Sequence, residues 1–163
     1  MKTLILMRHA KSTWKEKKVD DYDRPLSKRG KKDAPRMGEL LKEHNLLPDL
    51  IIASTSVRTH ETVDLVIEAS RYRGNICLFS DLYMGEIDVY FTHIRQLSDE
   101  VNTLLVIGHN PSLESILQLL TGKVESLPSG AVAHIQLPVD CWKDLNFEQT
   151  GTLVNFWKPK EID

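Results

Sequence analysis

The stretch Leu4-Ile5-Leu6-Met7-Arg8-His9 decides the fold that we expect for this chain. Its four apolar residues form a short run flanked by charge, which is typical of a buried β-strand. An arginine and a histidine therefore follow directly on a strand, and in open α/β sheets ligands bind at that edge. A histidine there can attack phosphorus while the neighbouring guanidinium holds the phosphoryl oxygens. The stretch thus predicts an anion site at the carboxyl edge of a sheet.

Two further apolar runs end in residues of the same chemistry. Leu50–Ala53 leads into Ser54 and, a few residues on, Arg58. Leu104–Ile107 leads into Gly108-His109-Asn110. Residues just past the ends of neighbouring parallel strands share one edge of the sheet. We therefore expect the residues that follow these runs to line one pocket, with Arg58 reaching back from the first turn of a helix.

Signals for strands and helices alternate along the remaining chain. Ser27 can cap a helix that runs to about His44, although Pro35 offers a second possible start for it. Apolar spacing predicts further helices over 56–70, 87–97 and 112–120, and short strands over 76–79, 131–137 and 153–157. This alternation predicts an α/β fold: a single three-layer domain over residues 1–163, with a mostly parallel sheet and helices on both faces. The last two strands can add antiparallel pairing.

The composition is that of one globular domain with its own core. The chain has 163 residues, of which 41% are hydrophobic, and a formal net charge of −2. Such a charge gives no general attraction to nucleic acid or to an anionic membrane, and no segment approaches the ~20 apolar residues of a membrane span. The two cysteines, Cys77 and Cys141, form no CxxC pair, which suits a cytoplasmic protein and argues against a thiolate zinc site. The lysine run at Lys15, Lys17 and Lys18 is expected to face solvent.

Four motifs, in order along the chain, resemble the histidine phosphatase superfamily. They are Met7–Ser12, Asp23–Gly30, Ser54–Thr62 and Gly108–Glu114. The first is similar to the Arg-His-Gly signature of that superfamily, and its Ala-Lys-Ser ending resembles the small bacterial SixA-type branch, the phosphohistidine phosphatases. The resemblance covers almost the whole chain. It implies a phosphoglycerate-mutase-like fold without a cap insertion, because only 81–102 separate the third and fourth predicted strands.

By this resemblance His9 is the nucleophile that becomes phosphorylated, and Arg8, Arg58 and His109 surround the phosphoryl group. A histidine nucleophile must be neutral, with its other ring nitrogen best fixed by a backbone carbonyl. A cation-rich pocket favours the neutral form. Water then hydrolyses the phosphohistidine intermediate. Because arginines supply the positive charge, we expect no metal and no other cofactor.

Three further assignments concern phosphate binding. Ser54 can bond the phosphate or cap the helix that follows it. Arg24 can line the pocket or brace its loop through an ion pair with Asp21 or Asp23. Asn110, next to the second histidine, is a further candidate phosphate ligand.

The identity of a general acid decides the substrate class. Larger superfamily members carry a glutamate proton donor in a motif after the third strand, and Leu82–Glu86 does not reproduce that motif. Glu86 and Asp88 are the candidates here. An imidazole leaves phosphorus more readily than an alkoxide, so a weak acid suffices for phosphohistidine. With no cap, the pattern favours a phosphohistidine phosphatase acting on a phosphorylated signalling protein, such as a histidine phosphotransfer domain. The alternatives are a metal-independent phosphatase of a small phosphorylated metabolite and a non-catalytic phosphoprotein-binding module.

Overall fold

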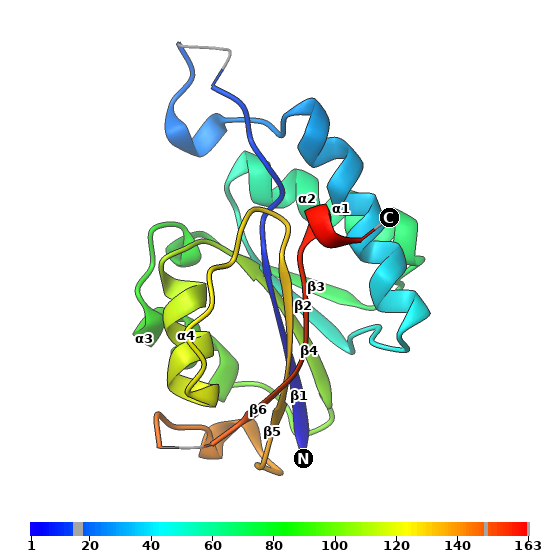
Figure 1. Cartoon of the computed structure of the whole chain (residues 1–163). Coiled ribbons are helices and arrows are strands. Elements are labelled where there is room, and N and C mark those ends of the chain that lie inside the picture. Colours follow the sequence, from blue (N-terminus) through cyan, green and yellow to red (C-terminus); the bar gives the residue numbers. More distant parts are fainter. Residues whose placement is uncertain (15–17, 149, 163) are drawn as a thin grey trace.

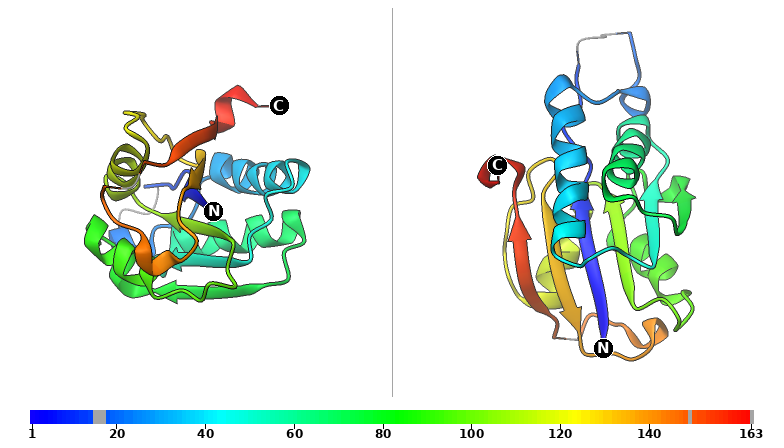
Figure 2. Two further views of the ribbon diagram at one scale, coloured as in Figure 1. Left: turned by 90° about the horizontal axis from the view of Figure 1, so that it is seen from below. Right: turned by 90° about the vertical axis from the view of Figure 1, so that its right-hand side faces the viewer.

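The architecture is a six-stranded sheet with helices on both faces (Figures 1 and 2). The computed structural model describes residues 1–14, 18–148 and 150–162, so Lys15 and Lys17 of the lysine run lie outside the described residues. The strands are β1 (Lys2–Arg8), β2 (Leu50–Ser54), β3 (Asn75–Phe79), β4 (Thr103–Gly108), β5 (Val132–Leu137) and β6 (Thr152–Trp157). The α-helices are α1 (Lys28–Glu43), α2 (Val57–Ser70), α3 (Ile87–Arg95) and α4 (Ser112–Thr121). Short 3₁₀ turns are η1 (Asp21–Asp23), η2 (Ser80–Leu82), η3 (Trp142–Asp144) and η4 (Pro159–Glu161).

The sheet is mostly parallel, with the strand order β3-β2-β4-β1-β5-β6. The first four strands, β1 to β4, pair with one another in parallel. β5 lies antiparallel to β1, and β6 lies antiparallel to β5. The predicted fold class and the antiparallel pairing of the last two strands are therefore confirmed. Three of the runs that carry the candidate residues, β2, β4 and β1, are adjacent in the sheet.

Alternation of side chains along the strands divides the core into two layers. Ile5 and Met7 point to the face covered by α1 and α2, and Leu4 and Leu6 to the face covered by α3 and α4. All four side chains are fully buried. Figure 2 shows the two helix pairs on opposite sides of the sheet. Burial on both faces explains why these strands read as continuous apolar runs.

Helix α1 begins at the predicted cap. The Ser27 hydroxyl accepts a hydrogen bond from the Gly30 N–H at 3.1 Å. The alternative start at Pro35 is wrong, because Pro35 lies inside the helix. Its missing N–H costs one backbone hydrogen bond. The Ser27 cap and the burial of the apolar face of α1 outweigh that loss. The buried apolar residues of this face, before and after Pro35, are Ala34, Met37, Leu40 and Leu41.

Nothing resembling a cap domain lies between β3 and β4. The connection from Ser80 to Asn102, all of it described, holds only η2 and α3. The site edge of the sheet is therefore left open on that side. None of the helices in the described part of the chain combines the length and the apolar character that a membrane crossing requires.

Candidate active site

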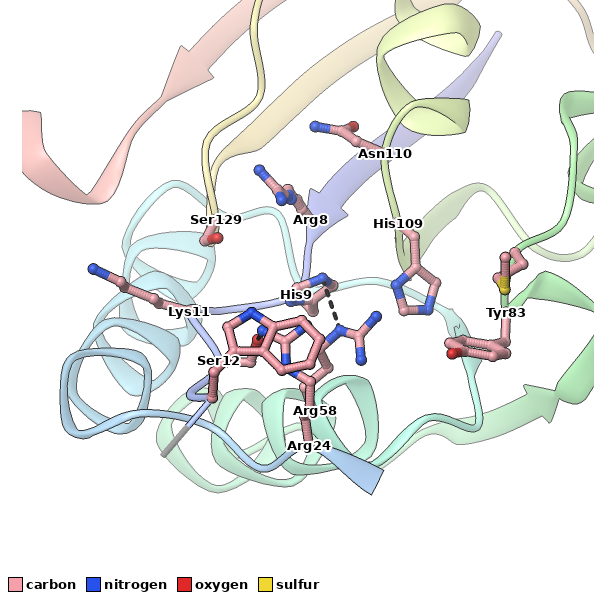
Figure 3. A pocket seen from close by; sticks show the side chains of 12 residues that line it. Arg8, His9, Lys11, Ser12, Arg24, Arg58, Tyr83, His109, Asn110 and Ser129 are labelled. Atoms are coloured by element: carbon pink, nitrogen blue, oxygen red, sulfur yellow. Dashed lines mark hydrogen bonds between the residues drawn. The ribbon is translucent and has the colours of Figure 1, made fainter. Parts of the chain in front are cut away.

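The strand register brings two histidines together at the carboxyl edge of the sheet. Arg8 on β1 is paired with Gly108 on β4, so the next residue of each strand leaves the sheet at an adjacent point. These residues are His9 and His109, and their ring centroids lie 5.1 Å apart (Figure 3). Both side chains are buried, with 6% and 7% exposure.

His9 is held as a neutral imidazole with a defined orientation. Its Nδ1 lies 2.8 Å from the carbonyl oxygen of Ala10, which is the backbone hydrogen bond expected from the sequence. The proton therefore sits on Nδ1, and Nε2 accepts a hydrogen bond from Arg58 Nε at 3.3 Å (Figure 3). Burial, helped by His109, Arg58 and Arg8, lowers the pKa of His9 to about 3. Nε2 thus carries a lone pair at neutral pH, and burial contributes more to this than the cations do.

Arg58 is fixed by a carboxylate behind it. It lies in the first turn of α2, and its guanidinium donates to the backbone oxygen of Asp21 at 2.7 Å and to the Asp21 carboxylate at 3.1 Å. The same carboxylate accepts from the Tyr83 hydroxyl at 2.6 Å and from Arg24 at 2.8 Å. The Tyr83 hydrogen bond, followed by Arg24 and Arg58, lowers the pKa of Asp21 to about 2. We call these four residues the Asp21 clasp.

The sequence predicted the arginines of the Asp21 clasp but not its tyrosine. Arg24 both lines the pocket and pairs with Asp21, so its two predicted roles hold together. Its guanidinium carbon also lies 3.5 Å from the centre of the Trp14 ring. Tyr83 was missed. The available signal was its place in Leu82–Glu86, the stretch that departs from the glutamate motif.

Ser54 has neither of the roles considered for it. It is fully buried and outside the pocket lining, and its Oγ lies 2.8 Å from His109 Nε2. The same Oγ accepts from the Ser56 N–H at 3.3 Å, which leaves the Ser54 proton free to go to His109. α2 is preceded by Ser56 as its N-cap residue. Ser54 therefore orients His109, whose opposite ring edge lies toward His9 (Figure 3).

His109 is neutral for the same reason as the first histidine. Burial, followed by the charge of Arg58, lowers the pKa of His109 to about 4. Its backbone N–H donates to the Tyr90 hydroxyl at 3.2 Å. Three hydroxyls lie within 3.5 Å of its Nε2, those of Ser54, Ser56 and Thr59, so a hydroxyl donor can satisfy Nε2 and leave the other ring nitrogen to donate to an anion.

Arg8 and Asn110 share one backbone acceptor. Arg8 Nη1 and Asn110 Nδ2 donate to the carbonyl oxygen of Leu127 at 3.1 and 2.9 Å. The Leu127 N–H in turn donates to Glu114 at 2.7 Å. Both Arg8 and Asn110 line the pocket, and in the described part of the chain the buried Arg8 Nε has no hydrogen-bond partner. A buried donor of this kind favours a ligand that accepts from it.

The candidate acid Glu86 lies outside this pocket. Glu86 and Asp88 are exposed, at the start of α3, and neither lines the pocket. Tyr83 and Met84 line it instead on this side. Among the described residues, none of the side chains that line the pocket is a carboxylate.

The pocket is a cationic cavity of about 390 Å³. Three guanidiniums line it, those of Arg8, Arg24 and Arg58, together with the two neutral imidazoles. Arginine forks match phosphoryl oxygens, and a neutral imidazole is a nucleophile. Within the described residues, no group of three or more His, Cys, Asp or Glu side chains is arranged to hold a metal ion.

Comparison with known sequences finds a matching family model and relatives of similar sequence. Residues 4–77 match the family model of the histidine phosphatase superfamily, branch 1. An uncharacterized protein of Mycobacterium leprae is 31% identical over 167 residues, covering 94% of this chain and 100% of the relative. An uncharacterized chloroplastic protein of Arabidopsis thaliana is 30% identical over 155 residues, covering 86% of this chain and 69% of the relative.

Comparison with solved structures shows the same fold. A candidate SixA phosphohistidine phosphatase of Agrobacterium tumefaciens superposes with a TM-score of 0.83 at 24% identity, covering 97% of this chain and 98% of that one. The protein histidine phosphatase SixA in complex with tungstate gives 0.82 at 20%, covering 97% of each chain. A phosphoglycerate mutase of Bacillus anthracis gives 0.64 at 17%, covering 82% of this chain and 87% of that one. With its phosphoglycerate-mutase-like fold and its sequence relatives, the chain belongs to the histidine phosphatase superfamily.

Proposed function

We propose that this protein is a phosphatase that hydrolyses phosphohistidine on another protein through a phosphorylated His9. The observation that carries the proposal is the state of His9: Nδ1 is tied to the Ala10 carbonyl, and Nε2 lies unprotonated among guanidiniums. Binding alone would not need a nucleophilic nitrogen held in this way. A cytoplasmic location and a phosphorylated signalling protein as partner are part of the proposal.

The reaction runs in two displacements. In the first, His9 Nε2 forms a bond to phosphorus while the bond from phosphorus to the substrate imidazole breaks, and that imidazole takes up a proton from solvent through the open mouth of the pocket. In the second, a water oxygen bonds to phosphorus and the bond to Nε2 breaks, which releases phosphate and restores His9. Arg8 and Arg58 hold the phosphoryl oxygens, and His109 donates to them as charge redistributes. For this the hydrogen bond from Arg58 to Nε2 is exchanged for one to a phosphoryl oxygen.

Two features support phosphohistidine over a phosphate ester. No cap covers the pocket, so a histidine standing on a protein surface can enter. No carboxylate among the described side chains lines the pocket to protonate a poor leaving group, and an imidazole needs the least help. The SixA structure complexed with tungstate is named a protein histidine phosphatase, and the likeness in fold agrees with the same chemistry here.

Substrate choice is the direct test. We expect kcat/KM on a histidine-phosphorylated carrier protein to exceed that on a phosphoserine peptide or a sugar phosphate by about tenfold or more, or about 1.4 kcal/mol of activation free energy. Phosphate release from the three substrates under the same conditions measures it. A preference for the sugar phosphate would move the protein to the metabolite phosphatases. Tight binding without release of phosphate would make it a phosphoprotein-binding module.

A matched pair of carboxylate substitutions tests the acid. Glu86→Gln should leave kcat/KM within about twofold on every substrate, since Glu86 is exposed and outside the pocket. Asp21→Asn opens the Asp21 clasp and loosens Arg58, and should cost about 10- to 10²-fold. A large loss from Glu86→Gln, confined to phosphate esters, would show that Glu86 is a general acid after all.

Metal removal should have no effect. The positive charge in the pocket comes from arginines, so we expect full activity after dialysis against EDTA. The measurement is the rate of phosphate release before and after dialysis, with and without added magnesium or zinc. Loss of activity that either metal restores would contradict the metal-free chemistry proposed here.

A further inference from the structure

A second hollow adjoins the pocket. This groove of about 940 Å³ shares Arg8, Lys11 and Ser129 with the smaller pocket. Its far wall is formed by α1 and by the segment at Lys158–Glu161, which includes η4. η4 packs against α1 near the carboxyl edge of the sheet (Figure 1). We call this hollow the basic groove.

The charge of the basic groove is strongly one-sided. Five cationic side chains line it: Arg8, Lys11, Arg29, Lys158 and Lys160. Its two carboxylates are already paired, since Asp33 lies 3.0 Å from Arg29, and Glu161 lies 4.0 Å from Lys158. Three cations therefore have no carboxylate within ion-pair distance among the described residues: Arg8, Lys11 and Lys160.

On the opposite side of the pocket, the chain carries acidic side chains instead of basic ones. Figure 3 shows Lys11 and Ser129 on one side of the two histidines and Tyr83 on the other. The chain around Tyr83 carries three exposed carboxylates: Asp81, which lies 2.8 Å from His93, and, after Tyr83, Glu86 and Asp88. Because the whole chain has a net charge of −2, the cations of the basic groove reflect a local separation of charge and not a basic protein.

The mouth of the pocket also exposes apolar side chains. Trp14 is 61% and Met84 82% exposed, and both line the pocket. Trp and Met are enriched in protein–protein interfaces, where large side chains provide much of the binding energy. A free phosphate or a small anion would leave these two side chains in water. A protein partner can cover them while its phosphorylated side chain enters the pocket.

We propose that the basic groove binds an acidic segment of the phosphorylated protein, with aspartate and glutamate side chains beside the phosphohistidine. This inference rests on the proposed function and specifies its substrate. Exposed lysines on flexible stems suit carboxylates spread along a peptide, and complementary charge mainly fixes orientation and speeds encounter. The cations lie on one side of the pocket and the exposed carboxylates of Glu86 and Asp88 follow Tyr83 on the other, so this charge difference favours one orientation of an acidic partner.

Two short peptides with a central histidine provide the test. One carries aspartate and glutamate on one side of the histidine, and the other carries serines there. Both are used in phosphorylated form for kinetics and in unphosphorylated, fluorescein-labelled form for binding by anisotropy. The variant is Lys158→Glu with Lys160→Glu, at residues outside the catalytic pocket. The matched control is Lys123→Glu with Lys143→Glu, the same change of charge on exposed lysines beyond the far end of α4 and on η3.

We expect the native protein at low salt to have a KM about tenfold lower for the acidic peptide than for the serine peptide, and high salt to remove the difference. The groove variant should lose this preference with kcat unchanged, and the control variant should keep it. Anisotropy with the unphosphorylated acidic peptide should follow the same order.

Equal KM and equal binding for the two peptides, or equal losses in groove and control variants, would overturn the proposal while leaving the phosphatase activity in place. If the native protein hydrolysed neither phosphopeptide, the proposed function would fail, and anisotropy would still decide whether the groove prefers acidic peptides. Stronger displacement of the labelled peptide by a single-stranded oligonucleotide than by unlabelled acidic peptide would also overturn it, in favour of a nucleic-acid site.

Discussion

Replacing His9 by alanine is expected to abolish turnover while leaving the fold intact. In the proposed reaction Nε2 of His9 is the atom that bonds to phosphorus, whereas Nε2 of the neighbouring His109 is turned to the buried Ser54 hydroxyl 2.8 Å away. Within the described residues the His9 side chain makes two hydrogen bonds, to the Ala10 carbonyl and from Arg58, so the strands that carry the site should persist. Phosphate release and the thermal unfolding midpoint of the variant measure the two expectations.

Quenched reactions extend this test to the intermediate. Mass spectrometry under alkaline conditions should find an acid-labile phosphoryl group on His9 in the native protein and none in His9→Ala. His60→Ala is a matched control, because His60 is exposed on α2 and outside the pocket lining. Turnover surviving in His9→Ala, or a phosphoryl group found on another residue, would remove the covalent mechanism.

Arg58→Ala and His109→Ala should each lower kcat/KM by about 10²- to 10³-fold, the usual loss when one preorganised donor is removed. Arg58 contacts Nε2 of His9 directly, and a ring nitrogen of His109 faces the same space (Figure 3). Their removal acts on the chemical step, so the loss should fall on kcat more than on KM. Arg73→Ala, at an exposed residue after α2, is the control for lost positive charge. Near-native rates in either variant would place that residue outside the reaction.

The site residues that could be predicted best from the sequence are those at the ends of the strands. Buried parallel strands read as short apolar runs, so the positions of His9 and His109 followed from the runs before them. Ser54 shows the limit. It lies within β2, and alternation along the strand sends its side chain to the same face as Leu50 and Ile52, beneath His109 and away from the pocket. A shift of one residue in the end of a strand decides between those two outcomes.

The Asp21 clasp could not be predicted for a different reason. It joins Asp21 to Arg58 and Tyr83, which are 37 and 62 positions away along the chain. The segments that carry Asp21 and Tyr83 have no periodic apolar pattern, so nothing in their sequence indicates that the two segments meet. The candidate acid Glu86 lies in the same region and outside the pocket lining: Tyr83 and Met84 line the pocket, while Glu86 precedes α3 and is exposed.

The register between β1 and β4 has a consequence for how such a protein can diversify. Inserting one residue into either strand would turn its final side chains to the opposite face of the sheet and separate the two histidines. An insertion between β3 and β4 that leaves Tyr83 and Tyr90 in place changes no register, because that connection pairs with no strand. Outside those two tyrosines, reaction chemistry and substrate range are therefore encoded in separate parts of the chain. Natural variation in loop length can explore new substrates at little risk to the phosphoryl-transfer step.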